Sequence, residues 1–158
     1  MMLPWFQWLE SSGIGNAIRL SPWAFAVIES VHLLGLAVIG GAVLLVCMRQ
    51  LGVGLQRQPI AEVARETYPW LVISWVIMMV TGSALFLSEA VKCYYSTPFW
   101  VKMTSLLLAT IFTFAVQQRV ARADETRVGP MWQRVVALVS LVLWFGVGAG
   151  GRWIGFSG

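Results

Sequence analysis

The sequence predicts an all-α membrane protein: a four-transmembrane-helix bundle preceded by an N-terminal interfacial helix. Hydrophobic residues make up 58% of the 158 residues and charged residues only 11%. A soluble domain has about 25% charged residues to cover its surface, so this chain has too few. The apolar residues also gather in four runs, and a helix needs about 20 such residues to cross a bilayer. The length fits a single membrane domain, residues 1–158.

The first segment, residues 3–18, is too short and too polar to cross a membrane. It carries Trp5 and Trp8, and tryptophan favours the headgroup region of a bilayer. We therefore expect one interfacial helix that lies along the membrane surface. The segment has no apolar core and includes Glu10, so we expect no cleaved signal peptide.

Four spans follow this helix. Ser21 and Pro22 have the pattern of a helix cap followed by proline at the first helical position, so the first span begins there. A short polar helical turn over residues 60–66 precedes the second span. The predicted transmembrane helices are residues 22–48, 69–87, 99–116 and 135–151.

The orientation follows from the basic residues in the loops. The loops 49–67 and 117–134 together hold seven of the 11 lysines and arginines. Cytoplasmic loops are enriched in these residues, so we expect both loops in the cytoplasm and both termini in the periplasm. The expected location is the bacterial inner membrane. Cys47 and Cys93 then lie on opposite sides of it, so we expect no disulfide between them within one chain.

Ionisable residues within the spans converge on the outer half of the predicted bundle. Glu29 and His32 lie one helical turn apart in the first span, Lys102 one turn into the third, and Arg152 at the end of the fourth. An ionisable side chain inside a membrane is costly and points to a functional site. We predict a site formed by these four residues, with polar neighbours Ser30, Ser74, Thr81, Ser83, Thr104 and Ser105.

Two interpretations of this cluster stay open. In the first, it is a binding site for haem b, a quinone or a copper ion, in that order, and serves electron or proton transfer. In the second, the protein is a non-catalytic accessory or scaffold subunit, and ion pairs between Glu29 and Lys102 or Arg152 only lock the helices together.

His32 is the single histidine and the candidate metal ligand. A neutral imidazole can bind haem iron or a metal ion, carry a proton, or only form a hydrogen bond in the core. One histidine excludes two histidine ligands from the same chain. The remaining haem options are a methionine partner (Met78, Met79 or Met103), five-coordinate iron, or His32 from two copies.

Small residues predict close helix contacts. Gly35, Gly40 and Gly41 lie in the first span, and Gly146 and Gly150 form a GxxxG motif in the fourth. These contacts fit either packing within the bundle or an oligomer, and we expect a homo-oligomer or a subunit of a larger membrane complex. The sequence has no basic stripe interleaved with aromatics, so nucleic acid is not an expected partner.

Several short motifs carry a resemblance that spans most of the chain. They are Glu29-x-x-His32-x-x-Gly35, Arg49-x-Leu51-Gly52, Leu85-Phe86, Phe99-x-x-Lys102, Ser140-Leu141-x-Leu143-Trp144 and Gly151-Arg152. In these motifs the chain resembles a family of small bacterial four-helix inner-membrane proteins of unknown function. It is also distantly similar to the membrane domain of copper-resistance D-type proteins, at the level of the fold. The resemblance implies the four-helix fold and points to Glu29, His32, Lys102 and Arg152, without implying an activity.

Overall fold

The computed structural model describes residues 3–123 and 128–154, and these residues form helices and turns with no strand. Its long helices are α3 (Pro22–Leu51), α4 (Ile60–Ser88), α6 (Thr97–Phe112) and α8 (Pro130–Ile154). Counting the short helices that continue α6 to Arg122, four helical segments are long and apolar enough to cross a membrane. The predicted four-span helical bundle is confirmed, and the chain is a multi-pass membrane protein.

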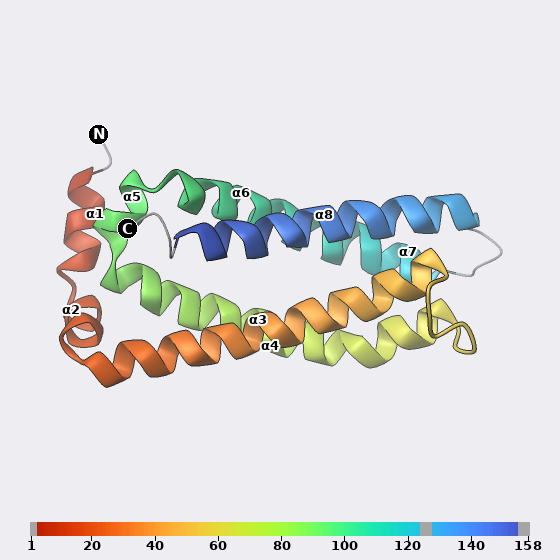
Figure 1. Cartoon of the computed structure of the whole chain (residues 1–158), viewed down its shortest axis with the longest axis horizontal. Coiled ribbons are helices and arrows are strands. Elements are labelled where there is room, and N and C mark those ends of the chain that lie inside the picture. Colours follow the sequence, from red (N-terminus) through yellow and green to blue (C-terminus); the bar gives the residue numbers. More distant parts are fainter. Residues whose placement is uncertain (1–2, 124–127, 155–158) are drawn as a thin grey trace.

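The long helices form two pairs. α3 packs against α4, α6 packs against α8, and α3 also packs against α8. Figure 1 shows the start of α1 (Leu3–Glu10) and the end of α8 at the same end of the bundle, which we call the termini end. The α3–α4 connection, α7 (Gln118–Arg122) and the start of α8 lie at the opposite end, which we call the loop end.

The predicted interfacial helix is divided into α1 (Leu3–Glu10) and α2 (Gly13–Leu20). Ser12 caps the second helix, because its Oγ accepts a hydrogen bond of 3.3 Å from the amide of Gly15. α2 packs against α4. Gly15 permits this contact, because a Cβ atom there would overlap with the carbonyl oxygen of Leu87.

α3 begins where the sequence predicts. The Ser21 side chain accepts a hydrogen bond from the amide of Ala24, and Pro22 occupies the first turn. The helix runs beyond the predicted 22–48 to Leu51 and ends at Gly52, whose φ of 76° lies in the left-handed region. Glycine adopts this conformation without a steric penalty, so it ends the helix cleanly.

α4 begins well before the predicted start at residue 69. Its first two turns are part of the bundle, because Ile60, Val63 and Ala64 pack against Val46 and Ala121 in a buried cluster. Pro69 therefore lies inside the helix rather than at its start. A proline within a membrane helix is tolerated when surrounding groups compensate for the lost backbone hydrogen bond, and tertiary packing decides this.

The connection predicted over residues 88–98 contains a further helix, α5 (Ala90–Tyr95). α6 continues past the predicted end at residue 116 through a π-helical segment, η1 (Thr113–Gln117), and α7 (Gln118–Arg122). Two polar side chains of η1 bind α8: Trp144 Nε1 donates to Thr113 Oγ1 and Ser140 Oγ donates to Gln117 Oε1. Such π segments are rare and frequently occur at functional sites.

The glycines support the predicted helix contacts only in part. A Cβ atom at Gly146 would lie 3.0 Å from Ser105 Oγ, and one at Gly150 would lie 3.1 Å from Lys102 Cβ, so the GxxxG motif of α8 packs on α6. Gly35 packs against Met78. At Gly40 and Gly41 nothing in the described chain lies within 4 Å of an added Cβ, so these two glycines make no close contact within the bundle, and the oligomer alternative stays a prediction.

Candidate functional site

His32 lies half-buried where α3 packs on α4. Its Nδ1 is 2.8 Å from Thr81 Oγ1, and this hydroxyl donates its own hydrogen bond of 2.6 Å to the carbonyl of Ile77. A threonine hydroxyl has one hydrogen, so Thr81 accepts from His32. The hydrogen-bond network therefore assigns the proton to Nδ1 and leaves a free lone pair on Nε2 of the neutral ring.

Glycine allows this ring to approach α4. The Cε1 of His32 is 3.1 Å from the position that a Cβ of Gly82 would occupy. One helical turn further along the same contact, the sulfur of Met78 lies 3.3 Å from the position that a Cβ of Gly35 would occupy. Of the three candidate methionines, Met78 is buried, Met79 is half-buried and Met103 is exposed, and Met78 packs against Gly35 in the α3–α4 contact.

Lys102 approaches the same region from α6. Its stem packs on Gly150, and its Nζ lies 3.6 Å from the position of a Cβ at Gly151. The charge on Lys102 is close enough to influence His32. Lys102 forms no ion pair with any residue that the structure describes. A half-buried ammonium without a counter-ion favours a ligand that is anionic or accepts hydrogen bonds.

The other two predicted site residues, Glu29 near the start of α3 and Arg152 near the end of α8, also lie at the termini end. Glu29 is exposed and has no ion pair or hydrogen bond to a described side chain. Arg152 is exposed in the last turn of α8. Among residues 3–123 and 128–154 the ion pair within 4 Å joins Arg19 to Glu10, so the structure contains no Glu29–Lys102 pair.

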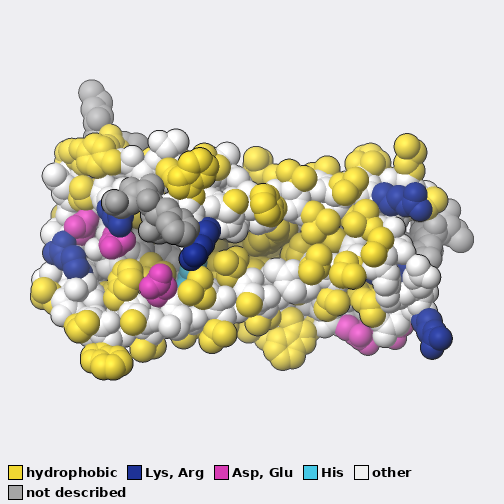
Figure 2. Space-filling view, in the orientation of Figure 1, with side chains coloured by type: hydrophobic (Ala, Val, Ile, Leu, Met, Phe, Trp, Pro, Cys, Tyr) yellow, Lys and Arg dark blue, Asp and Glu magenta, His cyan; other side chains and the backbone are white. Residues whose placement is uncertain are grey.

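Of the predicted polar neighbours, Thr81 is the one that binds an ionisable residue. The hydroxyls of Ser30, Ser74, Ser83 and Thr104 donate to carbonyls of their own helices. Figure 2 shows the histidine between basic and acidic side chains, near the termini end of a hollow between the α3–α4 pair and the α6–α8 pair. No residue of α6 from Thr97 to Leu108 is buried.

Cys93 lies in α5, close to Lys102 and outside the spans. Burial, reinforced by the nearby carboxylate of Glu89, raises the pKa of the Cys93 thiol to about 11. The thiolate is the reactive form, and with this pKa only about one thiol in a thousand is ionised at pH 8.

We expect iodoacetamide to modify Cys93 slowly at pH 8 and about tenfold faster for each pH unit up to about pH 11, because deprotonation limits the reaction. The modification rate is measured by mass spectrometry of a Cys47→Ser protein, in which Cys93 is the remaining cysteine. A rate that levels off near pH 9 would show an ordinary, solvated thiol.

A second polar cluster, at the loop end, has no counterpart among the sequence predictions. Gln117 Nε2 is 3.2 Å from Cys47 Sγ and 3.4 Å from Gln50 Oε1, and Gln50 Nε2 donates to Gln133 Oε1 at 2.9 Å. Gln117 Oε1 accepts from Ser140 Oγ at 2.8 Å. All five side chains are buried. The sequence signal was the seven-residue spacing of Gln133, Ser140 and Val147, which places them on one face of α8.

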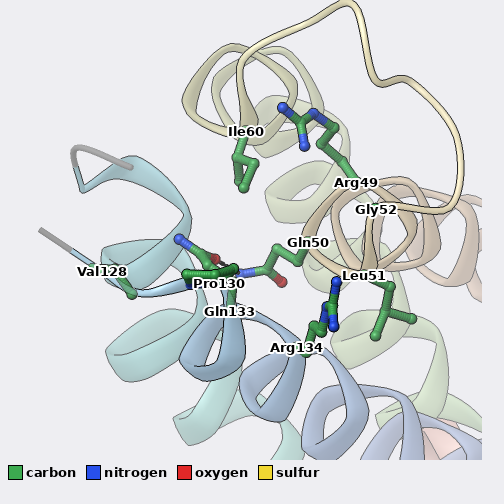
Figure 3. Close-up of a pocket in the computed structure, with 9 residues that line it drawn as sticks. All are labelled: Arg49, Gln50, Leu51, Gly52, Ile60, Val128, Pro130, Gln133 and Arg134. Atoms are coloured by element: carbon green, nitrogen blue, oxygen red, sulfur yellow. Dashed lines mark hydrogen bonds between the residues drawn. The ribbon is translucent and has the colours of Figure 1, made fainter. Parts of the chain in front are cut away.

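Figure 3 shows the open side of this cluster, where Gln50 and Gln133 meet, with Arg49 and Arg134 on opposite sides of Gln50. The cavity holds about 200 Å³ and is lined by Arg49, Gln50, Leu51, Gly52, Ile60, Val128, Pro130, Gln133 and Arg134. Because Gln50 and Gln133 bind each other, this cavity presents amides that already have partners.

Among the described residues, no group of three or more His, Cys, Asp and Glu side chains is arranged to hold a metal ion. Both cysteines are free: Cys47 is buried and Cys93 is half-buried. His32 is therefore the side chain on which the candidate site depends.

Comparison with known families identifies the chain. A family profile matches residues 5–157, which includes every long helix and both candidate clusters. The chain belongs to DUF6644, a family of unknown function. Comparisons with curated proteins and with solved structures find no match. For this DUF6644 protein, the residues of the site therefore provide the basis for proposing a function.

Proposed function

We propose that this DUF6644 protein is an electron-transfer membrane protein that binds haem b at the termini end of the bundle. His32 Nε2 would bind the iron, and the ammonium of Lys102 would pair with a propionate. The observation that carries the proposal is the hydrogen-bond chain from His32 Nδ1 through Thr81 Oγ1 to the Ile77 carbonyl. Histidines that bind metals typically donate their other ring N–H to an acceptor that fixes the ring and its tautomer, and here the hydroxyl of Thr81 is that acceptor.

Two further features support haem. Four-helix bundles commonly hold haem between facing helices, and here the hollow lies between the two helix pairs (Figure 2). Lys102 has no counter-ion among the described residues, which suits a propionate. Haem supplies one-electron chemistry when bound. The chain's part is to fix the imidazole through Thr81 and to hold the anionic edge through Lys102. With arginine-rich loops in the cytoplasm, this end would face the periplasm in a bacterial inner membrane.

The absorption spectrum of the purified protein tests the proposal. We expect a Soret band that His32→Ala removes. Thr81→Ala should retain haem with affinity reduced by about 10- to 100-fold, because an outer-shell partner of the ligand is lost. Ser83→Ala is the matched control: Ser83 lies on the same helix but binds the carbonyl of Met79, so its removal should leave the spectrum unchanged.

The same two side chains also suit a quinol of the membrane as a second candidate. His32 Nε2 would accept the hydrogen of one hydroxyl, and Lys102 would donate to the other oxygen. A colourless protein whose solvent extract contains quinone, lost in His32→Ala, would favour this ligand. A colourless protein without quinone or copper would contradict both ligands and favour the accessory-subunit interpretation.

A further inference from the structure

A groove on the opposite end of the bundle carries a separate inference. It lies between α4 and the α6–η1–α7 segment and holds about 370 Å³, with lining residues Tyr68, Phe114, Gln118, Arg119, Arg122 and Ala123. The described residues that line the groove present two cations, an amide and two aromatic rings, and none of them is a carboxylate. It lies at the loop end, at the polar end of the candidate span Thr97–Arg122.

Gln118 is the residue that requires an explanation. Its side chain is only 5% exposed, and neither its amide nitrogen nor its amide oxygen has a hydrogen-bond partner among the described residues. A buried polar group left without a partner costs about 1–3 kcal/mol. A ligand in the groove that accepts a hydrogen bond from the Gln118 amide nitrogen would remove the part of this cost that belongs to the nitrogen.

The charges and rings in the groove select the ligand. Arg119 and Arg122 are exposed basic residues at the end of the span, and the guanidinium of Arg122 lies 4.3 Å above the ring of Tyr68. Phe114 meets Tyr68 edge to face at 6.4 Å and forms an apolar wall. Basic pockets between membrane helices at this depth suit anionic phospholipid head groups.

We propose that this groove binds the phosphate head group of an anionic phospholipid. Arg119 and Arg122 neutralise the phosphate, the Gln118 amide donates to one of its oxygens, and Phe114 and Tyr68 contact the glycerol and the first methylenes. This site is independent of His32 and Lys102, which lie at the other end of the bundle.

The test compares thermal unfolding of the full chain in detergent with and without added lipid. Phosphatidylglycerol should raise the midpoint of unfolding of the wild-type protein, whereas phosphatidylcholine and inorganic phosphate should not. Native mass spectrometry should show phosphatidylglycerol affinity reduced about fivefold by Arg119→Gln and by Arg122→Gln, since each basic residue near an anionic lipid contributes about 1 kcal/mol. Arg57→Gln, an exposed loop arginine outside the groove, is the control and should bind lipid as the wild type does.

Gln118→Leu separates lipid binding from folding. Without lipid, this variant should be at least as stable as the wild type, because it removes a buried amide without partners. Its stabilisation by phosphatidylglycerol should be smaller. The proposal is overturned if Gln118→Leu keeps the full lipid response, if Arg57→Gln weakens binding as much as the groove variants, or if inorganic phosphate alone stabilises the protein as lipid does.

Discussion

Gly150→Val is expected to destabilise the bundle by about 1–3 kcal/mol, because overpacking a close contact forces backbone movement. A Cβ atom at Gly150 would lie 3.1 Å from Lys102 Cβ, 3.2 Å from its Cα and 3.3 Å from its backbone nitrogen. Backbone atoms cannot rotate away as a flexible side chain can, so α6 and α8 must separate. The midpoint of thermal unfolding in detergent, followed by tryptophan fluorescence, measures the loss.

The matched control lies two residues earlier in the same helix. Gly148 has nothing within 4 Å of an added Cβ, so Gly148→Val should leave the unfolding midpoint nearly unchanged. Gly150→Val should also lower ligand affinity at the termini end without touching His32, because the displaced α6 carries Lys102. Equal unfolding midpoints for the two variants would show that the α6–α8 contact at Gly150 is not a close one.

Gln117→Leu is the second substitution with a large expected effect, a loss on the order of 2–4 kcal/mol. The change removes the Gln117 amide, which accepts a hydrogen bond from the Ser140 hydroxyl and donates one to the amide oxygen of Gln50. Both of these buried groups then lack this partner. Each buried polar group that loses its partner costs about 1–3 kcal/mol. Equilibrium unfolding in mixed micelles measures the change, and Gln58→Leu, at an exposed position of the α3–α4 connection, serves as the control.

A double-mutant cycle separates this hydrogen bond from the effect of side-chain shape. Combining Gln117→Leu with Ser140→Ala removes both partners of the 2.8 Å bond, so the double variant should lose less stability than the two single losses together. Strict additivity would mean that the two side chains do not interact in the membrane.

The part of the candidate site formed by His32 and Lys102 could be predicted from the sequence, because the order of the spans determines at which end of the bundle each residue lies. The order of the spans places residues 32 and 102 at the same end of the bundle, and the structure brings Lys102 within electrostatic reach of His32. Thr81, which binds the imidazole of His32, was predicted only as one of six polar neighbours of the site. Glu29 was predicted as part of the site from its spacing to His32, but in the structure it is exposed and has no ion pair with a described residue.

The sequence by itself determined the fold class, the number and order of the spans, and the start of α3. These are local properties: an apolar run of sufficient length forms a membrane helix, and the Ser21–Pro22 pair begins one. Tertiary structure decided which side of each helix faces its neighbours. α3 is apolar around its whole circumference, so hydrophobicity does not distinguish its lipid-facing from its protein-facing side.

Contacts that depend on how each helix is rotated about its own axis therefore appeared only in the structure. They include the approach of His32 to Thr81 and Gly82, the glutamine cluster around Gln117, and the buried amide of Gln118. In each case a small residue or a hydrogen bond from a second helix fixes the side chain, and no periodicity within one helix encodes that partner.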